Sequence, residues 1–263
     1  MTTPSVLTDI GANGIATITF NRPDLHNAID ESVIAQFNAG LRRVAADPAA
    51  RVVVIAGNGK SFCAGADLNW MKRTANYSEE QNHRDALEFT EILDLLDRMP
   101  KPTIARVHGA AYGGGVGIVS CCDVAIGTPE AVFSFSEVRL GLIPAMISPY
   151  AVAVIGERYA RRYMLTAERI DAAEALKIGL LHEVCAAGEL DAKVAAIVEH
   201  CLRGGPAAIA RSKALIAAVA HGAIDEAKRD YTARMIAATR ASDEGKEGIA
   251  AFLEKRKPAW TNR

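Results

Sequence analysis

Three consecutive glycines, Gly113, Gly114 and Gly115, are the feature that most restricts how this chain can fold. They follow an apolar, strand-like run and precede a small, apolar segment that can form a helix. Glycine lets the backbone approach a ligand closely, and the first N–H groups of a helix have no partner within that helix. These N–H groups lie at the positive end of the helix dipole and can hold an oxyanion or a phosphate. We therefore predict half of an oxyanion hole here; the alternative is a tight strand-to-helix turn packed in a core.

Strand-like and helix-like segments alternate along the first half of the chain. Residues 15–20 alternate as a strand does, and residues 52–56 form a β-branched run that is typical of a buried strand. Between them, Asp30 can cap a helix with one apolar face. A Walker loop at residues 59–61 is excluded because it would need glycine at Val54, and no dinucleotide-type glycine spacing is completed. The pattern predicts an α/β fold built in layers.

A glutamate in the middle of the chain is a candidate acid or base. Residues 131–138 alternate and place Phe133, Phe135 and Glu137 on one side of a predicted strand. Aromatic surroundings disfavour the charged form of a carboxyl group and raise its pKa, which suits proton transfer near neutral pH. The alternative is a solvent-facing glutamate at the end of a strand.

The second half of the chain is predicted to be mostly helical. Residues 204–206 read Gly-Gly-Pro, which places glycine after one helix and proline at the start of the next. The last helix begins with acidic residues 243–244 and ends with basic residues 255–257, each charge at the favourable end of the helix dipole. These C-terminal helices form a predicted second domain.

Charge and cysteine content limit the class of protein. The 263 residues carry 30 basic and 31 acidic side chains, which gives no global field for nucleic acid or an anionic membrane. The five cysteines are odd in number and two of them are adjacent, which predicts a reducing cytoplasm rather than a disulfide framework. We also expect no membrane span, because no run of about 18 apolar residues occurs.

Four segments together resemble the enoyl-CoA hydratase/isomerase family, the crotonase superfamily. They read NRPDLHNAID (21–30), GKSFCAGADL (59–68), HGAAYGGGVG (108–117) and FSEVRLGLIP (135–144), and residues 157–184 and the run GIAAFLEKRKPAW near the C-terminus extend the resemblance. The resemblance implies an α/β crotonase-like spiral of strand-strand-helix turns over residues 1–200, with the CoA and active sites. It also implies a helical C-terminal trimerisation domain over residues 201–263, and trimers that often pair into hexamers.

Catalytic residues are carried over from the family position by position. The resemblance implies that the backbone N–H groups of Ala66 and Gly114 form the oxyanion hole, and that Glu137 is the catalytic acid. Hydratases of the family use two glutamates, and the position of the first is Gly117 in this chain. Isomerases of the family often use one acid near the Glu137 position, and hydration with one carboxylate is also chemically possible.

Substrate-binding residues follow from the same resemblance. The family's CoA site implies backbone contacts to adenine from residues 64, 67 and 68, and contacts to adenosine and its phosphates from the last helix of a neighbouring subunit. Asp24 stands where the family often has a basic residue, so Arg22 or Lys60 could replace that phosphate contact. No metal or redox cofactor is expected, because CoA is part of the substrate. The carried-over CoA-binding residues are Ala64, Asp67, Leu68, Phe252 and Lys255.

A narrower similarity favours hydration. The runs AYGGGVG and SEVRLGLIPAMISPY look like the branch that includes methylglutaconyl-CoA hydratases of leucine breakdown. A substrate of that branch carries a second carboxylate, for which Tyr112 and Arg139 are candidate partners. Gly117, at the position of the family's first glutamate, is also carried over as a substrate-binding residue. The leading hypothesis is a lyase that hydrates an enoyl-CoA; the alternatives are a Δ3-Δ2-enoyl-CoA isomerase and a CoA-binding protein without chemistry. RNA binding, known among relatives, gains no support from the balanced charge.

Overall fold

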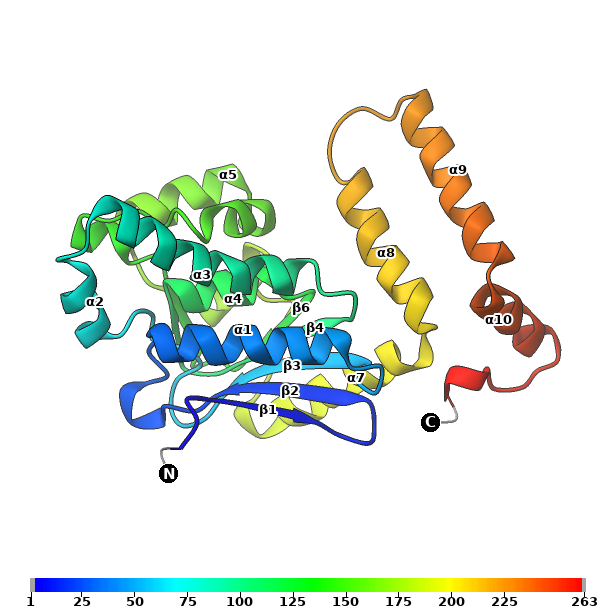
Figure 1. Cartoon of the computed structure of the whole chain (residues 1–263), viewed down its shortest axis with the longest axis horizontal. Coiled ribbons are helices and arrows are strands. Elements are labelled where there is room, and N and C mark those ends of the chain that lie inside the picture. Colours follow the sequence, from blue (N-terminus) through cyan, green and yellow to red (C-terminus); the bar gives the residue numbers. More distant parts are fainter. Residues whose placement is uncertain (1–2, 262–263) are drawn as a thin grey trace.

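Two β-sheets and the helices that cover them make up the body of the protein, which a computed structural model describes over residues 3–261 (Figure 1). The larger sheet has six strands in the order β1 (Val6–Ile10), β2 (Ile15–Phe20), β3 (Val52–Gly57), β4 (Thr103–Val107), β6 (Val124–Gly127) and β9 (Glu183–Val184). The smaller sheet has the order β5 (Ala110–Tyr112), β7 (Val132–Ser134) and β8 (Ile170–Asp171).

The larger sheet is parallel except at one edge, where β1 and β2 form an antiparallel pair. All six residues of β3 are buried. A central parallel strand is covered on both faces, which explains why its sequence is a continuous apolar run and does not alternate. The prediction of a buried strand at residues 52–56 is therefore confirmed.

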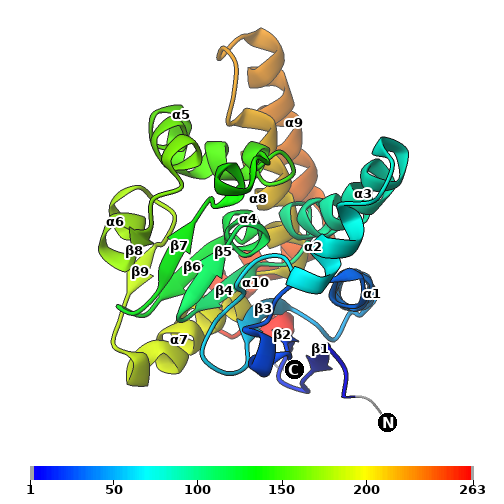
Figure 2. The ribbon, with the colours of Figure 1, turned by 90° about the vertical axis from the view of Figure 1, so that its left-hand side faces the viewer.

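Two successive turns of the chain each contribute one strand to each sheet. Strand β4 belongs to the larger sheet, the next strand β5 to the smaller one, and α4 follows; β6 and β7 repeat the same division. Figure 2 shows β5 and β7 beside β4 and β6, with α4 next to β5. This arrangement confirms the predicted α/β spiral of strand-strand-helix turns.

Most helices follow the sequence signals, but the last helix ends at Leu253, before the basic residues 255–257 that were predicted to end it. Asp30 accepts a hydrogen bond from the Val33 N–H and caps α1, as predicted, and the apolar face of α1 packs in the core. The α-helices are α1 (Glu31–Ala46), α2 (Leu68–Thr74), α3 (Glu79–Asp97), α4 (Gly114–Cys121), α5 (Ser148–Thr166), α6 (Ala172–Lys177), α7 (Leu190–Arg203), α8 (Pro206–Val219), α9 (Glu226–Ala241) and α10 (Asp243–Leu253). Four short 3₁₀ helices are η1 (Pro23–Leu25), η2 (Glu137–Leu140), η3 (Ala187–Glu189) and η4 (Ala259–Thr261).

The prediction of one strand over residues 131–138 is wrong in its second half. Strand β7 ends at Ser134, and Glu137 begins the 3₁₀ helix η2. Only three residues pair with β5, and Ser136 then takes a helical backbone conformation that leaves the sheet. Phe133 and Phe135 are both buried, so the apolar positions were predicted correctly although the backbone around Glu137 was not.

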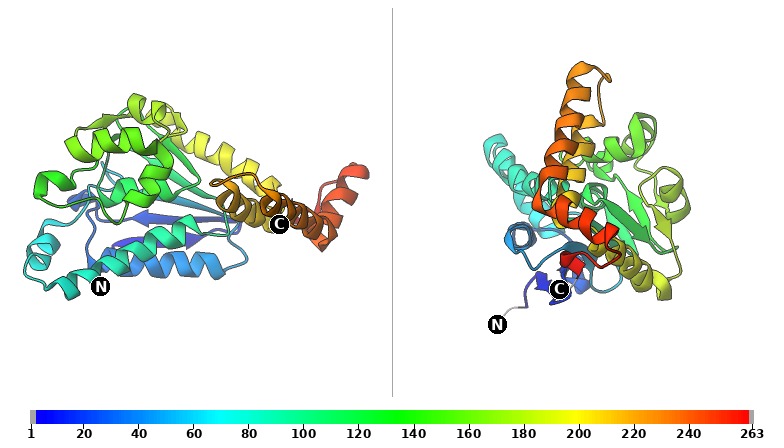
Figure 3. Two further views of the ribbon diagram at one scale, coloured as in Figure 1. Left: turned by 90° about the horizontal axis from the view of Figure 1, so that it is seen from above. Right: turned by 90° about the vertical axis from the view of Figure 1, so that its right-hand side faces the viewer.

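Helices α8 to α10 extend away from the two sheets and helices α1 to α7, which together we call the body (Figures 1 and 3). Helix α7 still packs on β3, β4 and β6, and the Gly-Gly-Pro sequence after it separates α7 from α8. The predicted domain boundary at residues 200/201 lies within α7 and stays a prediction. Within residues 3–261, no helix is long and apolar enough to cross a membrane.

Candidate active site

A cavity of about 440 Å³ lies where the glycine triplet, helices α2 and α3 and the segment after β7 meet. Its walls are mainly apolar, which is typical of pockets that hold an organic group with a few oriented polar atoms. The lining residues are Ile29, Ala64, Gly65, Ala66, Leu68, Trp70, Met71, Thr74, Asn82, Asp85, Ala86, Phe89, Gly113, Gly114, Ser136, Glu137, Leu140, Leu142, Ile143, Pro144, Ala145, Met146 and Ile147.

The glycine triplet forms the N-terminus of α4 at one wall of the cavity. Gly113 precedes the helix with φ of 49°, in the region that favours glycine, and Gly114 is its first residue. A Cβ atom on Gly113 would lie 3.2 Å from Oε1 of Glu137, so the missing side chain lets the carboxyl group approach the helix N-terminus. The predicted strand-to-helix turn therefore also brings two predicted parts of the site together, the start of α4 and the carboxyl group of Glu137.

Ala66, in the loop before α2, also lines the cavity. The Ile29 N–H donates to Gly65 O and the Asp67 N–H donates to Ile29 O, both at 2.8 Å. These bonds hold the loop on either side of Ala66. Neither the Ala66 N–H nor the Gly114 N–H has an acceptor among residues 3–261. Two such donors at one cavity suit a developing oxyanion, although their catalytic role stays a prediction.

Glu137 contributes a carboxyl group to the same cavity. Its Oε2 atom is buried and has no hydrogen-bond partner among the residues that the structure describes. Burial raises the pKa of Glu137 above its ordinary value, and a hydrogen bond from its own backbone N–H only partly opposes this. A carboxyl group with a raised pKa and an unpaired oxygen is suited to exchange a proton with a bound molecule.

At Gly117, the position of the family's first glutamate, this chain has no space for a side chain. Gly117 is buried in α4 and does not line the cavity. A Cβ atom at this position would lie 2.3 Å from Cγ2 and 2.9 Å from Cβ of Ile147. Ile147 itself lines the cavity, so an aliphatic side chain occupies the space next to this position.

Asp85 is a second acidic side chain of the cavity and was missed in the sequence. It lies on α3, four residues before Phe89, and both residues line the cavity. Burial and the nearby Glu88 carboxylate raise the pKa of Asp85, while a hydrogen bond with the Trp70 side chain opposes that rise. Asn82, Asp85 and Phe89 recur at helical spacing, and that spacing was the signal available in the sequence.

The predicted substrate-binding residues separate into two groups. Ala64 and Leu68 line the cavity. Asp67 lies between them in sequence, but its side chain forms an ion pair with Arg22 and caps α2. Phe252 and Lys255 lie on and just after α10, on the far side of the molecule from α2 (Figure 1). One chain therefore does not bring these two groups together, and their joint role stays a prediction.

The candidate partners of a substrate carboxylate do not line the cavity. Arg139 is exposed on η2, and Tyr112 is half-buried on β5. Among the described residues, the cavity lining includes no lysine or arginine. Arg22, a possible phosphate ligand, is instead paired with Asp30 and Asp67.

Comparison with known proteins identifies relatives along the whole chain. The Enoyl-CoA hydratase/isomerase family profile matches residues 11–263. Crotonyl-CoA hydratase of Syntrophomonas wolfei is 34% identical over 95% of this chain and 95% of that protein. The crystal structure of an enoyl-CoA hydratase from Shewanella pealeana has a TM-score of 0.95 at 42% identity, covering 97% of this chain and 96% of that one. An enoyl-CoA hydratase structure from Mycobacterium smegmatis has a TM-score of 0.91 at 33% identity, covering 98% and 99%.

Proposed function

The chain belongs to the enoyl-CoA hydratase/isomerase family, and from that membership we propose that it adds water across the α,β double bond of an acyl-CoA thioester. The observation that carries the proposal is the cavity that joins the Glu137 carboxyl group to the N–H groups of Ala66 and Gly114. A thioester carbonyl held by both N–H groups would present its α and β carbons to one acid.

The two N–H groups would act on the charge that develops during the reaction. When water adds to the β carbon, the carbonyl oxygen gains negative charge as an enolate forms. Fixed donors stabilise this charge more than the neutral carbonyl of the substrate, and this difference lowers the barrier. In other enzymes the loss of one such donor costs about 3–4 kcal/mol.

Glu137 would transfer the protons. Its carboxylate takes a proton from the attacking water as the C–O bond forms at the β carbon. The resulting carboxylic acid then returns a proton to the α carbon, which completes the addition of H and OH and restores the carboxylate. A carboxyl group whose pKa is raised by burial can play both parts.

The acyl group of the substrate is bounded by the cavity walls. Crotonyl-CoA is one candidate, since the Syntrophomonas wolfei relative is named for it. The branch with methylglutaconyl-CoA hydratases makes 3-methylglutaconyl-CoA the second candidate. Its extra carboxylate would meet Asp85 in the cavity, and Arg139 lies outside the lining. The described chain thus offers more support for an uncharged acyl group.

A specific observation favours Δ3-Δ2 isomerisation as the second candidate function. Ile147 fills the space beside Gly117, so the two-glutamate arrangement of other hydratases cannot form at that position. An isomerase needs one acid that moves a proton between two carbons, and Glu137 can supply it.

The assembly that we propose is a homotrimer or hexamer, in which Phe252 and Lys255 of one subunit approach the CoA site of its neighbour. The exposed apolar side chains of α8 to α10 support this proposal. Sedimentation or light scattering measures the assembly directly.

Loss of the conjugated enoyl absorbance tests the function. Crotonyl-CoA and 3-methylglutaconyl-CoA are compared with wild type and Glu137→Gln. Hydration that the substitution abolishes supports the proposal. Absence of hydration, together with turnover of a 3-enoyl-CoA, supports the isomerase. Absence of turnover with all three substrates refutes both the hydratase and the isomerase and favours a CoA-binding protein without chemistry.

A further inference from the structure

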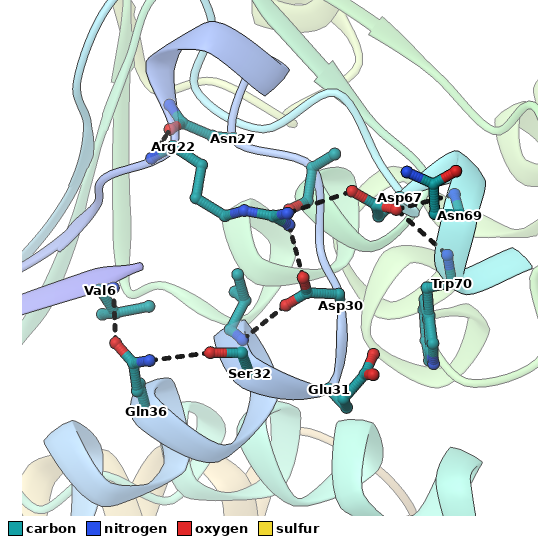
Figure 4. A network of polar contacts seen from close by, with 12 residues as sticks. Val6, Arg22, Asn27, Asp30, Glu31, Ser32, Gln36, Asp67, Asn69 and Trp70 are labelled. Atoms are coloured by element: carbon teal, nitrogen blue, oxygen red, sulfur yellow. Dashed lines mark hydrogen bonds and ion pairs between the residues drawn. The ribbon is translucent and has the colours of Figure 1, made fainter. Parts of the chain in front are cut away.

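One arginine connects the N-termini of two helices beside the cavity (Figure 4). Nη1 of Arg22 lies 2.9 Å from Oδ2 of Asp30, and Nη2 lies 3.2 Å from Oδ2 of Asp67. Nη1 also donates to Ala28 O at 2.7 Å. The side chains of Arg22, Asp30 and Asp67 are only 17%, 16% and 9% exposed, so this group of charges is largely removed from water.

Each carboxylate in this group also caps a helix. Oδ1 of Asp30 accepts the Val33 N–H at 2.9 Å at the start of α1. Oδ1 of Asp67 accepts the N–H groups of Asn69 and Trp70 at 2.8 and 3.1 Å at the start of α2. One oxygen of each carboxylate thus holds a helix and the other holds Arg22, which fixes the two helix starts relative to each other.

Ala66 lies immediately before one of these capping carboxylates. Its flanking residues are paired with Ile29, through the Ile29 N–H to Gly65 O and the Asp67 N–H to Ile29 O. Along an extended segment the N–H groups alternate in direction, so this pairing turns the Ala66 N–H away from Ile29. Ala66 is at the same time a lining residue of the cavity. The direction of this donor therefore depends on where Asp67 is held.

We propose that Arg22 is a positioning residue that fixes the direction of the Ala66 N–H by joining the capping carboxylates of α1 and α2. The inference rests on the proposed function, in which this N–H stabilises an enolate oxygen. Arg22 touches no substrate in this arrangement. It acts through Asp67, Asp30 and the carbonyl of Ala28.

The chemistry of arginine suits this position. A guanidinium group has five donors in a rigid plane and can serve three acceptors in fixed directions, whereas a lysine ammonium is a point charge. Without a cation, the two carboxylates would face each other in a poorly hydrated place and repel. Burial alone would raise the pKa of Asp67, but hydrogen bonds from the Trp70 and Asn69 N–H groups, with Arg22, hold it below its ordinary value.

The chain supplies a matched control on the same two helices. Arg73 on α2 pairs with Glu31 on α1 through both carboxylate oxygens, at 2.5 and 2.7 Å. These side chains are 48% and 54% exposed, and neither caps a helix through the paired oxygens. Removal of Arg73 thus removes a link between α1 and α2 without removing a largely buried charge.

The test compares Arg22→Gln, Arg22→Lys and Arg73→Gln in the full-length protein. Steady-state kinetics with crotonyl-CoA give kcat and KM, and amide hydrogen exchange follows residues 64–70, with residues 52–57 in β3 as a reference. We expect Arg22→Gln to lower kcat about 10- to 100-fold with a smaller change in KM, because a misplaced donor acts on the transition state. Arg22→Lys recovers part of kcat, and Arg73→Gln stays within about twofold of wild type.

Hydrogen exchange separates the failure of this inference from the failure of the proposed function. Faster exchange confined to Asp67, Asn69 and Trp70 in Arg22→Gln supports the positioning role. Wild-type kcat in Arg22→Gln, exchange that rises equally in β3, or an equal effect of Arg73→Gln overturns it. If wild type itself turns over no enoyl-CoA, the proposed function fails, and the exchange at residues 67–70 alone decides whether Arg22 orders the loop.

Discussion

The helices of the body and the C-terminal helices differ in what their apolar side chains contact. Helix α1 buries seven residues against the sheet and α3, among them Phe37 and Leu41. In the described chain, α8 and α9 bury no residue and α10 buries only Ala251. Large apolar side chains on or next to these three helices are exposed, namely Ile216, Ile224, Tyr231, Ile236, Ile249, Phe252 and Leu253.

This difference shows that the two regions obtain their stability from different sources. Isolated helices of this length are marginal in water, and most helix stability in proteins comes from packing of an apolar face. The body provides that packing within one chain. Helices α8 to α10 have apolar side chains without a covering surface, which supports the proposed assembly with further copies. The predictions below begin with the largest expected effect. The pair Phe37→Ala and Phe252→Ala tests this difference directly, and the other substitutions test the site and the packing of the body.

Glu137→Gln should have the largest effect, and only on activity. Loss of one proton-transferring group typically costs about 10²- to 10⁴-fold in rate. The ionised carboxylate starts the reaction, so wild-type kcat/KM falls as pH drops through a Glu137 pKa raised above the ordinary glutamate value. A pH series of initial rates measures this limb. Unchanged oligomer mass is the control, and a rate near wild type for Glu137→Gln would contradict the assignment.

Phe37→Ala should destabilise the body, whereas Phe252→Ala should not. Phe37 is fully buried, with its ring centroid 4.9 Å from that of Phe20, and its truncation should cost about 3–5 kcal/mol. Phe252 is 83% exposed in one chain, so its truncation should cost under about 0.5 kcal/mol in a dissociated subunit. Urea unfolding at low and high protein concentration measures both. Equal losses at low concentration would remove the distinction between the two regions.

Gly117→Ala should cost about 1–3 kcal/mol, because the new methyl group would overlap Ile147 in the packed body. The matched change Gly188→Ala meets no atom within 4 Å and should leave stability within about 0.5 kcal/mol of wild type. Thermal unfolding compares the two variants. A Gly117→Ala protein as stable as wild type would show that the space is open and that a glutamate could be accommodated.

Asp85→Asn should have the smallest effect, and it should change only the preference between a charged and an uncharged acyl group. Removal of a negative charge from the cavity should raise kcat/KM for 3-methylglutaconyl-CoA relative to crotonyl-CoA by roughly three- to tenfold, as expected for charges separated by several ångströms. Competition between the two substrates measures this ratio. Glu88→Gln, on the same helix but outside the lining, is the control. An equal change in both variants would exclude a local role for Asp85.

Much of the site was predictable because its residues lie in local patterns. The glycine triplet marked the start of α4, and Asp30 marked the start of α1. Glu137 was selected for its aromatic neighbours, yet the strand proposed for it ends at Ser134. Alternation predicts which side chains are buried, but it does not determine where a strand stops pairing.

Contacts between distant segments were not predictable in the same way. Asp85 faces the cavity because α3 packs beside α4, and Ile147 closes the space at Gly117 from 30 residues further along the chain. Helical spacing places Asp85 on one face of α3 with Phe89, but no local spacing relates that face to α4 or Ile147 to Gly117. Arg22 looked like a phosphate ligand in the sequence, and only the fold places it against Asp30 and Asp67.

Local sequence patterns were sufficient to predict the α/β class, the positions of most helices and strands, the glycine turn and the candidate acid Glu137. Those features depend on side-chain periodicity, capping and backbone freedom, which act over a few neighbouring residues. Only the folded chain shows that Ala66, Gly114 and Glu137 share one cavity, that Gly117 has no room for a side chain, and that Arg22 joins two helix caps. These features depend on packing between segments far apart in sequence. Atoms of one segment there occupy the space that a side chain of another would need, and burial makes each unpaired charge energetically costly.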